Sequence, residues 1–146
     1  MVRISSIVFG LAIAASAVAA PHKRQIGGLD CNLARLQLLF NIRATQNTLN
    51  AMNISSTDLH TGSAVASAQV GLNSANDVIQ GIFGALVAGQ LAPAASRQQV
   101  VDALNHANNS LATIKVPEFN STVQAAQATV LAAGNNANQV AAECTA

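Results

Sequence analysis

The sequence has no tryptophan and no tyrosine, and aromatic residues make up 3% of its 146 positions. Proteins that stack nucleic-acid bases or sugar rings use such side chains, so no platform of that kind is expected. Charged residues are also scarce, at 9%, and no cluster of Lys and Arg forms a basic footprint. These shortages exclude nucleic acid from the partners that we expect.

Catalytic motifs are missing as well. The chain has no Cys-x-x-Cys pair, no His-Glu-x-x-His sequence, no Gly-x-Ser-x-Gly elbow and no phosphate-binding glycine loop. Asp102 and His106 are four residues apart and share a helix face, and we interpret them as a solvated pair rather than as a catalytic base. The six acids are scattered along the chain. We therefore predict a protein that is not an enzyme and that has no cofactor and no metal site.

The first 20 residues have the pattern of a signal peptide. Arg3 supplies a positive charge, an apolar stretch covers residues 7–20, and small residues at 18–20 suit signal peptidase. A membrane anchor is the alternative, but a bilayer span needs about 20 strongly apolar residues, and this stretch is short and rich in alanine. The sequence therefore predicts a secreted, extracellular protein that is not transmembrane.

Residues 21–24 are predicted to form a short leader. Lys23 and Arg24 make a dibasic pair just before Gln25, which is typical of a Kex2-like cleavage site; the alternative is two charges in a flexible segment. Cleavage leaves residues 25–146 as a single helical domain. This domain is slightly acidic, because every acid remains and the remaining bases are Arg35, Arg43, Arg97 and Lys115.

Apolar residues recur at steps of three and four in four segments, which predicts helices over about 30–52, 57–89, 96–116 and 117–144. Ser56, Thr57 and Asp58 offer capping oxygens to the second helix, Ser96 is an N-cap for the third, and Pro117 suits the start of the fourth. The first helix has a broad apolar face, which predicts burial on more than one side: Leu33, Leu36, Leu38, Phe40, Ile42, Leu49 and Met52.

Short connections between four helices indicate an all-α, up-down bundle. Glycines interrupt the second helix, each at a cost of up to about 1 kcal/mol relative to alanine, and a break at Gly71 or Gly81 would give five helices. In an even-numbered bundle, Cys31 and Cys144 lie at the same end, so we predict that they form a disulfide. Closing so long a loop would stabilise the fold by about 4 to 5 kcal/mol in the chain-entropy model.

Three sequons are candidates for N-glycosylation, and they begin at Asn53, Asn108 and Asn120. Asn53 and Asn120 fall at predicted helix junctions, where a glycosylating enzyme has access. Asn108 lies beside the apolar stripe of the third helix, which disfavours its use.

Residues 78–91 are apolar nearly all round the predicted helix. One interpretation is that they form the central and most buried part of the bundle. The other is that their glycines leave an apolar groove, or let the bundle open onto a lipid or a hydrophobic surface.

The whole pattern, including the apolar repeat Val-Gly-Leu-Asn-Ser-Ala-Asn-Asp-Val-Ile-Gln at 70–80, resembles a group of small fungal secreted proteins. It is similar, over about Asp30 to Cys144, to the hydrophobic surface-binding protein A and cell-wall galactomannoprotein family. The resemblance implies a helical bundle that binds hydrophobic surfaces or fatty acids at the fungal cell wall.

Our leading hypothesis is a non-enzymatic secreted or wall-associated protein that binds an apolar ligand or a hydrophobic surface. The candidate contact residues are Leu72, Ile79, Ile82, Phe83, Leu86 and Leu91. The alternative is an apoplastic effector or elicitor that acts through protein contacts with a host, with the apolar run serving only as core. The sequence does not fix an oligomeric state.

Overall fold

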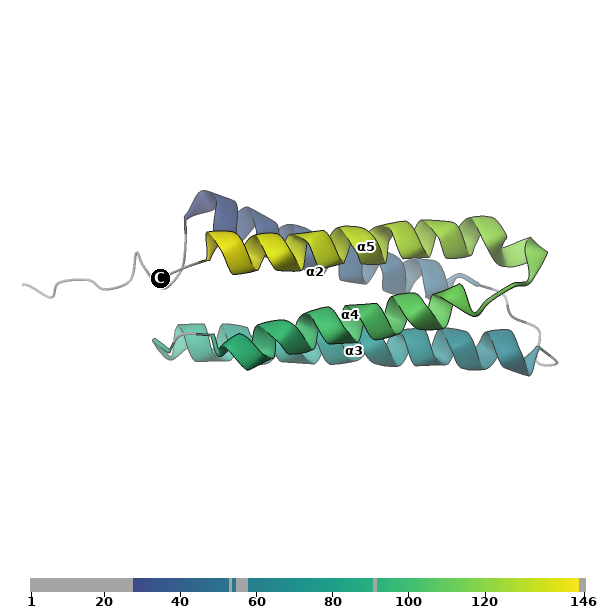
Figure 1. Ribbon diagram of the computed structural model, residues 1–146, viewed down its shortest axis with the longest axis horizontal. Coiled ribbons are helices and arrows are strands. Elements are labelled where there is room, and N and C mark those ends of the chain that lie inside the picture. Colours follow the sequence, from purple (N-terminus) through teal and green to yellow (C-terminus); the bar gives the residue numbers. More distant parts are fainter. Residues whose placement is uncertain (1–27, 53, 55–57, 91, 145–146) are drawn as a thin grey trace, which may run out of the picture.

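A computed structural model describes residues 28–52, 54, 58–90 and 92–144. Its four α-helices are α2 (Leu29–Asn50), α3 (Leu59–Val87), α4 (Ala94–Ala112) and α5 (Asn120–Glu143), and a 3₁₀ turn, η1 (Pro117–Phe119), precedes α5. Successive helices run in opposite directions, as Figure 1 shows. The predicted all-α, up-down bundle of four helices is therefore confirmed. The predicted signal peptide, the predicted leader with Lys23 and Arg24, and the residues Asn53 and Leu91 lie outside the described residues.

The helices associate as two pairs. α2 packs mainly against α5, and α3 packs mainly against α4; the α2/α5 pair then lies on the α3/α4 pair. Cys31, in the first turn of α2, forms a disulfide with Cys144, which directly follows α5, and their Cα atoms are 5.1 Å apart. The predicted disulfide is thus confirmed. We call this end of the bundle the cysteine end.

The core consists of one apolar stripe from each helix. Most residues of the stripes predicted for the last two helices are buried, among them Val100, Leu104, Leu111, Ile114, Val123 and Val130. Many of the other core residues are alanines, which lets the helix backbones approach closely. A partly buried hydrogen bond of 2.7 Å between the hydroxyls of Thr45 and Thr129 joins α2 to α5.

Helix α3 is continuous, so the break considered at Gly71 or Gly81 is wrong. Gly71 has a packing role instead: a Cβ atom there would lie 2.8 Å from the backbone oxygen of Ala103 in α4. At the start of α3, Asp58 is the N-cap residue, and its carboxylate accepts a hydrogen bond of 3.0 Å from the backbone N–H of Thr61. The capping role predicted for Asp58 is confirmed.

Two predictions about the helices are wrong. Ser96 is not the N-cap of α4, because the helix begins one turn earlier; Pro93 takes the N-cap position with φ −59° and accepts a hydrogen bond from the Ser96 N–H. Helix α2 is buried on one side only. Leu36 and Phe40 are 65% and 72% exposed, because α5 and α3 cover only the opposite face of α2.

Candidate functional site

A cavity of about 520 Å³ lies between the two helix pairs at the cysteine end. Small-molecule sites usually measure about 300–1,000 Å³, so its size suits a ligand. All four helices contribute to its wall, which is mostly apolar. The apolar side chains are Leu38, Leu39, Ile79, Ile82, Phe83, Leu86, Val100, Ala137 and Val140.

Chain connectivity explains why the cavity lies at this end. The connections from α2 to α3 and from α4 to α5 are both at the opposite end of the bundle. At the cysteine end, the disulfide holds α2 to α5, and residues 88–93 hold α3 to α4. Within the described residues, no covalent link therefore joins one pair to the other beside the cavity.

Two hydrogen bonds set the register between α2 and α3. Gln46 donates to the side-chain oxygen of Asn73, and Gln69 donates to that of Asn50, each at 2.8 Å. In antiparallel helices, each step toward the start of α2 is matched by a step toward the end of α3. The two bonds therefore fix which residues face each other across the cavity.

In this register, Arg43 lies opposite Asn76, and Arg35 lies opposite Gly84. All of these residues line the cavity. Gly84 leaves room there, because a Cβ atom at this position would meet nothing within 4 Å. The interface between α2 and α3 thus changes along its length: amide hydrogen bonds close it near Gln46, whereas apolar and basic side chains surround a space toward Arg35.

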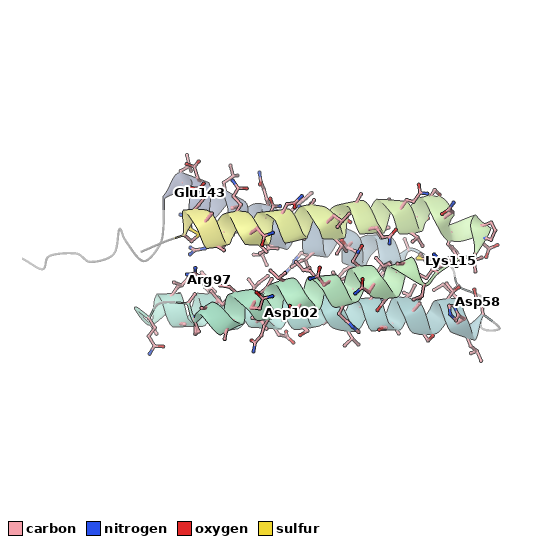
Figure 2. All side chains as sticks on the ribbon, viewed as in Figure 1. Asp58, Arg97, Asp102, Lys115 and Glu143 are labelled. Carbon is pink, nitrogen blue, oxygen red and sulfur yellow. A yellow bond between two sulfur atoms is a disulfide. The ribbon has the colours of Figure 1, made fainter. Side chains whose placement is uncertain are left out.

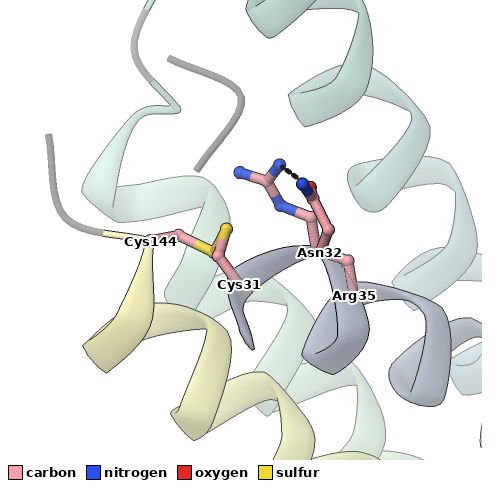
Figure 3. The surroundings of a disulfide bond; sticks show 4 residues. All are labelled: Cys31, Asn32, Arg35 and Cys144. Carbon is pink, nitrogen blue, oxygen red and sulfur yellow. Dashed lines mark hydrogen bonds between the residues drawn. A yellow bond between two sulfur atoms is a disulfide. The ribbon is translucent and has the colours of Figure 1, made fainter. Parts of the chain in front are cut away.

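The cavity is basic as well as apolar. Arg35, Arg43 and Arg97 line it, together with Asn76 and Gln80, whereas none of the described Asp and Glu residues does. Arg35 lies one helical turn after Cys31 of the disulfide, and it donates a hydrogen bond of 3.3 Å to the side-chain oxygen of Asn32 (Figure 3). Partial burial, and then the nearby charge of Arg97, lower the pKa of Arg35. Arg35 and Arg97 thus belong to different helix pairs and line the same cavity.

Sequence reasoning missed these arginines, which it counted only as part of the net charge. A signal was present for two of them: Arg35, Leu39 and Arg43 follow one another at steps of four, which places them on one helix face. No comparable pattern marks Arg97, because only the packing of α4 against the other helices brings it to the same cavity.

The candidate contact residues fall into three groups. Ile79, Ile82, Phe83 and Leu86 line the cavity. Leu72 is fully buried in the core and does not line it, and Leu91 lies outside the described residues.

The interpretation of residues 78–91 as the most buried part of the bundle is wrong. None of the described residues from 78 to 90 is buried, and Phe83 is 67% exposed. The buried part of α3 is its first half, up to Ala75, where α4 covers it closely. Beyond that point the cavity separates α3 from the α2/α5 pair.

A second apolar surface runs along the outside of α2. Its residues are spaced at steps of four, three and four, and all are exposed: Leu29, Leu33, Leu36 and Phe40, which we call the outer stripe. Leu36 and Phe40 also border a shallow hollow that Ala132 and Asn136 of α5 complete. The outer stripe faces away from the core, because Leu38 and Ile42, on the other side of α2, are the residues that pack inward.

Other candidate residues lie away from the cavity. Asn120 is exposed at the start of α5, whereas Asn108 is half-buried in the second half of α4. Asp102 accepts a hydrogen bond of 2.9 Å from Gln98, and the Nε2 atom of His106 lies 3.1 Å from the Ser67 hydroxyl, so the His106 contact links α4 to α3. Over the described ranges, no group of three or more His, Cys, Asp and Glu residues is arranged to hold a metal ion.

None of the described helices is both long enough and apolar enough to cross a bilayer. No family model, curated protein or solved structure matches the chain. Its function must therefore be argued from the cavity and the outer stripe.

Proposed function

We propose that the protein is a secreted, non-enzymatic binding protein that holds the apolar chain of a small ligand in the cavity between its helix pairs. The observation that carries this proposal is the mostly apolar wall contributed by all four helices. Export is supported by the signal-like N-terminal sequence and by the disulfide, since such bonds persist in oxidising compartments. The resemblance to fungal wall proteins suggests the cell wall or the exterior as the place of action.

The exposure of the cavity wall favours a ligand over a purely structural role. Ile82 is half-buried and Phe83 is mostly exposed, although both lie on an apolar helix segment. An alkyl chain in the cavity would remove this surface from water, at a gain of about 25 cal/mol for each Å² of apolar area buried. It would also supply contact partners to side chains that face the space between the pairs.

A titration with n-dodecanol, a neutral alkyl chain, tests the proposal by calorimetry. The double variant Ile82→Asp/Phe83→Asp places two charges in the cavity wall, and we expect it to abolish binding. The matched control is Leu36→Asp/Phe40→Asp, which adds the same charges to the outer stripe. We expect this control to bind like the wild type.

Circular dichroism and thermal melting must show that both variants fold. The substituted residues are exposed or half-buried, so each pair should leave the fold intact. Equal binding by the wild type and the cavity variant, or no binding by the wild type, would contradict the proposal.

The outer stripe favours a second candidate function, which is contact with a hydrophobic surface or with a host protein. Four exposed apolar residues on one face of one helix are the pattern by which amphipathic helices dock. In this case, Leu36→Asp/Phe40→Asp is the variant that loses adsorption to a hydrophobic surface or loses activity on host tissue. The cavity variant would then keep that activity, so the same two proteins separate the candidates.

A further inference from the structure

The cavity has a mouth on one side and a floor on the other. Its exposed lining residues all belong to α2 or α3: Arg43, Gln80, Phe83 and Gly84. Its buried lining residues come from α2, α4 and α5: Leu38, Val100 and Ala137. The mouth therefore lies between α2 and α3, and the floor lies against the core of the bundle.

Helix α3 extends beyond α4 at the cysteine end. Gly71 lies against Ala103, and the two helices are antiparallel, so Ala94 at the start of α4 comes level with a position close to Gln80. Figure 2 shows Arg97, in the first turn of α4, set back from the end of α3. The last two turns of α3 therefore have no residue of α4 opposite them, which leaves room for a ligand.

The polarity of the lining changes from the mouth to the floor. At the mouth, Arg43 and Gln80 are polar and exposed. At the floor, Leu38 and Val100 are apolar and buried. A ligand with one polar end and one apolar end matches this change, because its head stays in water while its chain is removed from water.

The volume of the cavity decides how many chains it holds. In liquid water one molecule takes up about 30 Å³, and a methylene group needs about as much space. A cavity of about 520 Å³ therefore corresponds to about 17 such groups. Because the mouth leaves part of this space to water, a single chain of about 12 to 16 carbons would fill the rest. Two chains of this length would not fit.

We propose that the cavity takes one unbranched alkyl chain of about 12 to 16 carbons, with its methyl end toward Val100 and its polar head at the mouth between α2 and α3. The ligand class is therefore a single-chain amphipath, and lipids with two chains are excluded. This inference rests on the proposed function, because the cavity must first bind an alkyl chain.

A series of n-alkanols from octanol to octadecanol tests the length of the chain. Each alcohol is kept below its solubility limit and competes with n-dodecanol for the protein. We expect the affinity to rise about fourfold for each added methylene group while the cavity is filling. The gain should stop between about 12 and 16 carbons, because further carbons stay in water.

Two glycerides test the number of chains. Monomyristoylglycerol and dimyristoylglycerol have the same kind of chain on a glycerol head, and both are offered in vesicles of palmitoyl-oleoyl phosphatidylcholine. After the vesicles are removed, we expect only the single-chain glyceride to remain with the protein.

Gly84 and Gly81 provide a matched pair of variants. A Cβ atom would meet nothing within 4 Å at either position, and both residues are exposed on α3, but only Gly84 lines the cavity. Gly84→Leu adds four carbons to the lining, so the chain length at which the gain stops should fall by about two to four carbons. Gly81→Leu should keep the wild-type chain length. Leucine favours a helix over glycine, so both variants should fold.

Each result decides the matter. A gain in affinity that continues to octadecanol, or that already stops at octanol, overturns the match to the cavity volume. Equal recovery of the two glycerides overturns the single chain. An unchanged chain length in Gly84→Leu, or the same decrease in Gly81→Leu, overturns the placement of the chain at the mouth. In these cases the proposed function survives if n-dodecanol binds, whereas failure of every alkanol to bind removes both.

Discussion

The two halves of α3 belong to one continuous helix, but they have opposite surroundings. In the first half, Gly71 lets α4 approach so closely that a Cβ atom would lie 2.8 Å from the backbone of α4. In the second half, a Cβ atom on Gly84 would meet nothing within 4 Å, and the position lines the cavity. The same residue type therefore marks a close helix–helix contact in one half and open space in the other.

This difference suggests that the first half of α3 serves stability and the second half serves ligand binding. The first half of α3 carries most of its buried residues, including Leu72, and fixes the α3/α4 pair. The second half keeps its apolar residues only half-buried or exposed, at the end where no covalent link joins the two pairs. We therefore expect changes in the first half to affect folding, and changes in the second half to affect ligand binding.

The largest effect should come from removing the disulfide at the cysteine end. In Cys31→Ser/Cys144→Ser, the free energy of unfolding should fall by about 4 to 5 kcal/mol, because the bond closes a loop with a sequence separation of 113. Denaturant unfolding followed by circular dichroism measures this loss. A decrease below about 1 kcal/mol would show that the α2/α5 pair holds without its covalent link.

The two glycines allow the most direct comparison of the halves. Gly71→Ala should destabilise the fold by about 1 to 3 kcal/mol, because the new methyl group overlaps the backbone of α4. Gly84→Ala should stabilise it by up to about 1 kcal/mol, since alanine favours the helix and meets no neighbour. Thermal unfolding of both variants measures whether each change lowers or raises the stability. Two changes of the same sign would contradict the distinction between the halves.

The smallest effect on stability is expected at Asp58, the N-cap residue at the start of the first half of α3. Contact with Thr61, through its side chain and its backbone N–H, lowers the pKa of Asp58. Because the folded-state pKa is the lower one, the contribution of Asp58 to stability is present above its unfolded pKa of about 4 and is lost as the pH falls through the folded value.

The urea midpoint at pH 7 and at pH 3 measures this contribution. Asp58→Asn keeps a capping side chain but cannot titrate, so its midpoint should depend less on pH than that of the wild type. Asp77→Asn, a change on the exposed surface of the same helix, is the control and should keep the wild-type dependence. An identical pH dependence of the midpoint in all three proteins would contradict the predicted contribution of Asp58 to stability.

The sequence was sufficient to predict the helices whose apolar residues form a single stripe. In α5, Val123, Val130 and the intervening alanines leave one face to bury, and the structure buries it. The disulfide followed from helix parity. Both predictions depend only on periodicity and connectivity, which are properties of the chain itself.

Predictions were wrong where a helix has more apolar surface than its neighbours cover. The outer stripe of α2 and the second half of α3 both have core-like patterns, but a pattern does not say whether another helix lies against it. An apolar groove in residues 78–91 was one of two interpretations of the sequence, whereas the three arginines of the cavity lining were not expected. Arg35 and Arg97 are 62 positions apart in sequence, and only the packed bundle places both on one cavity.

Hydrogen exchange of α3 with and without n-dodecanol tests the central claim most directly. If the cavity binds the alkyl chain, the amides of residues 76–87 should exchange more slowly when the ligand is present, while those of 59–75 change little because they are already packed. Equal exchange with and without ligand over 76–87, at a ligand concentration that saturates binding, would show that the cavity is not the site.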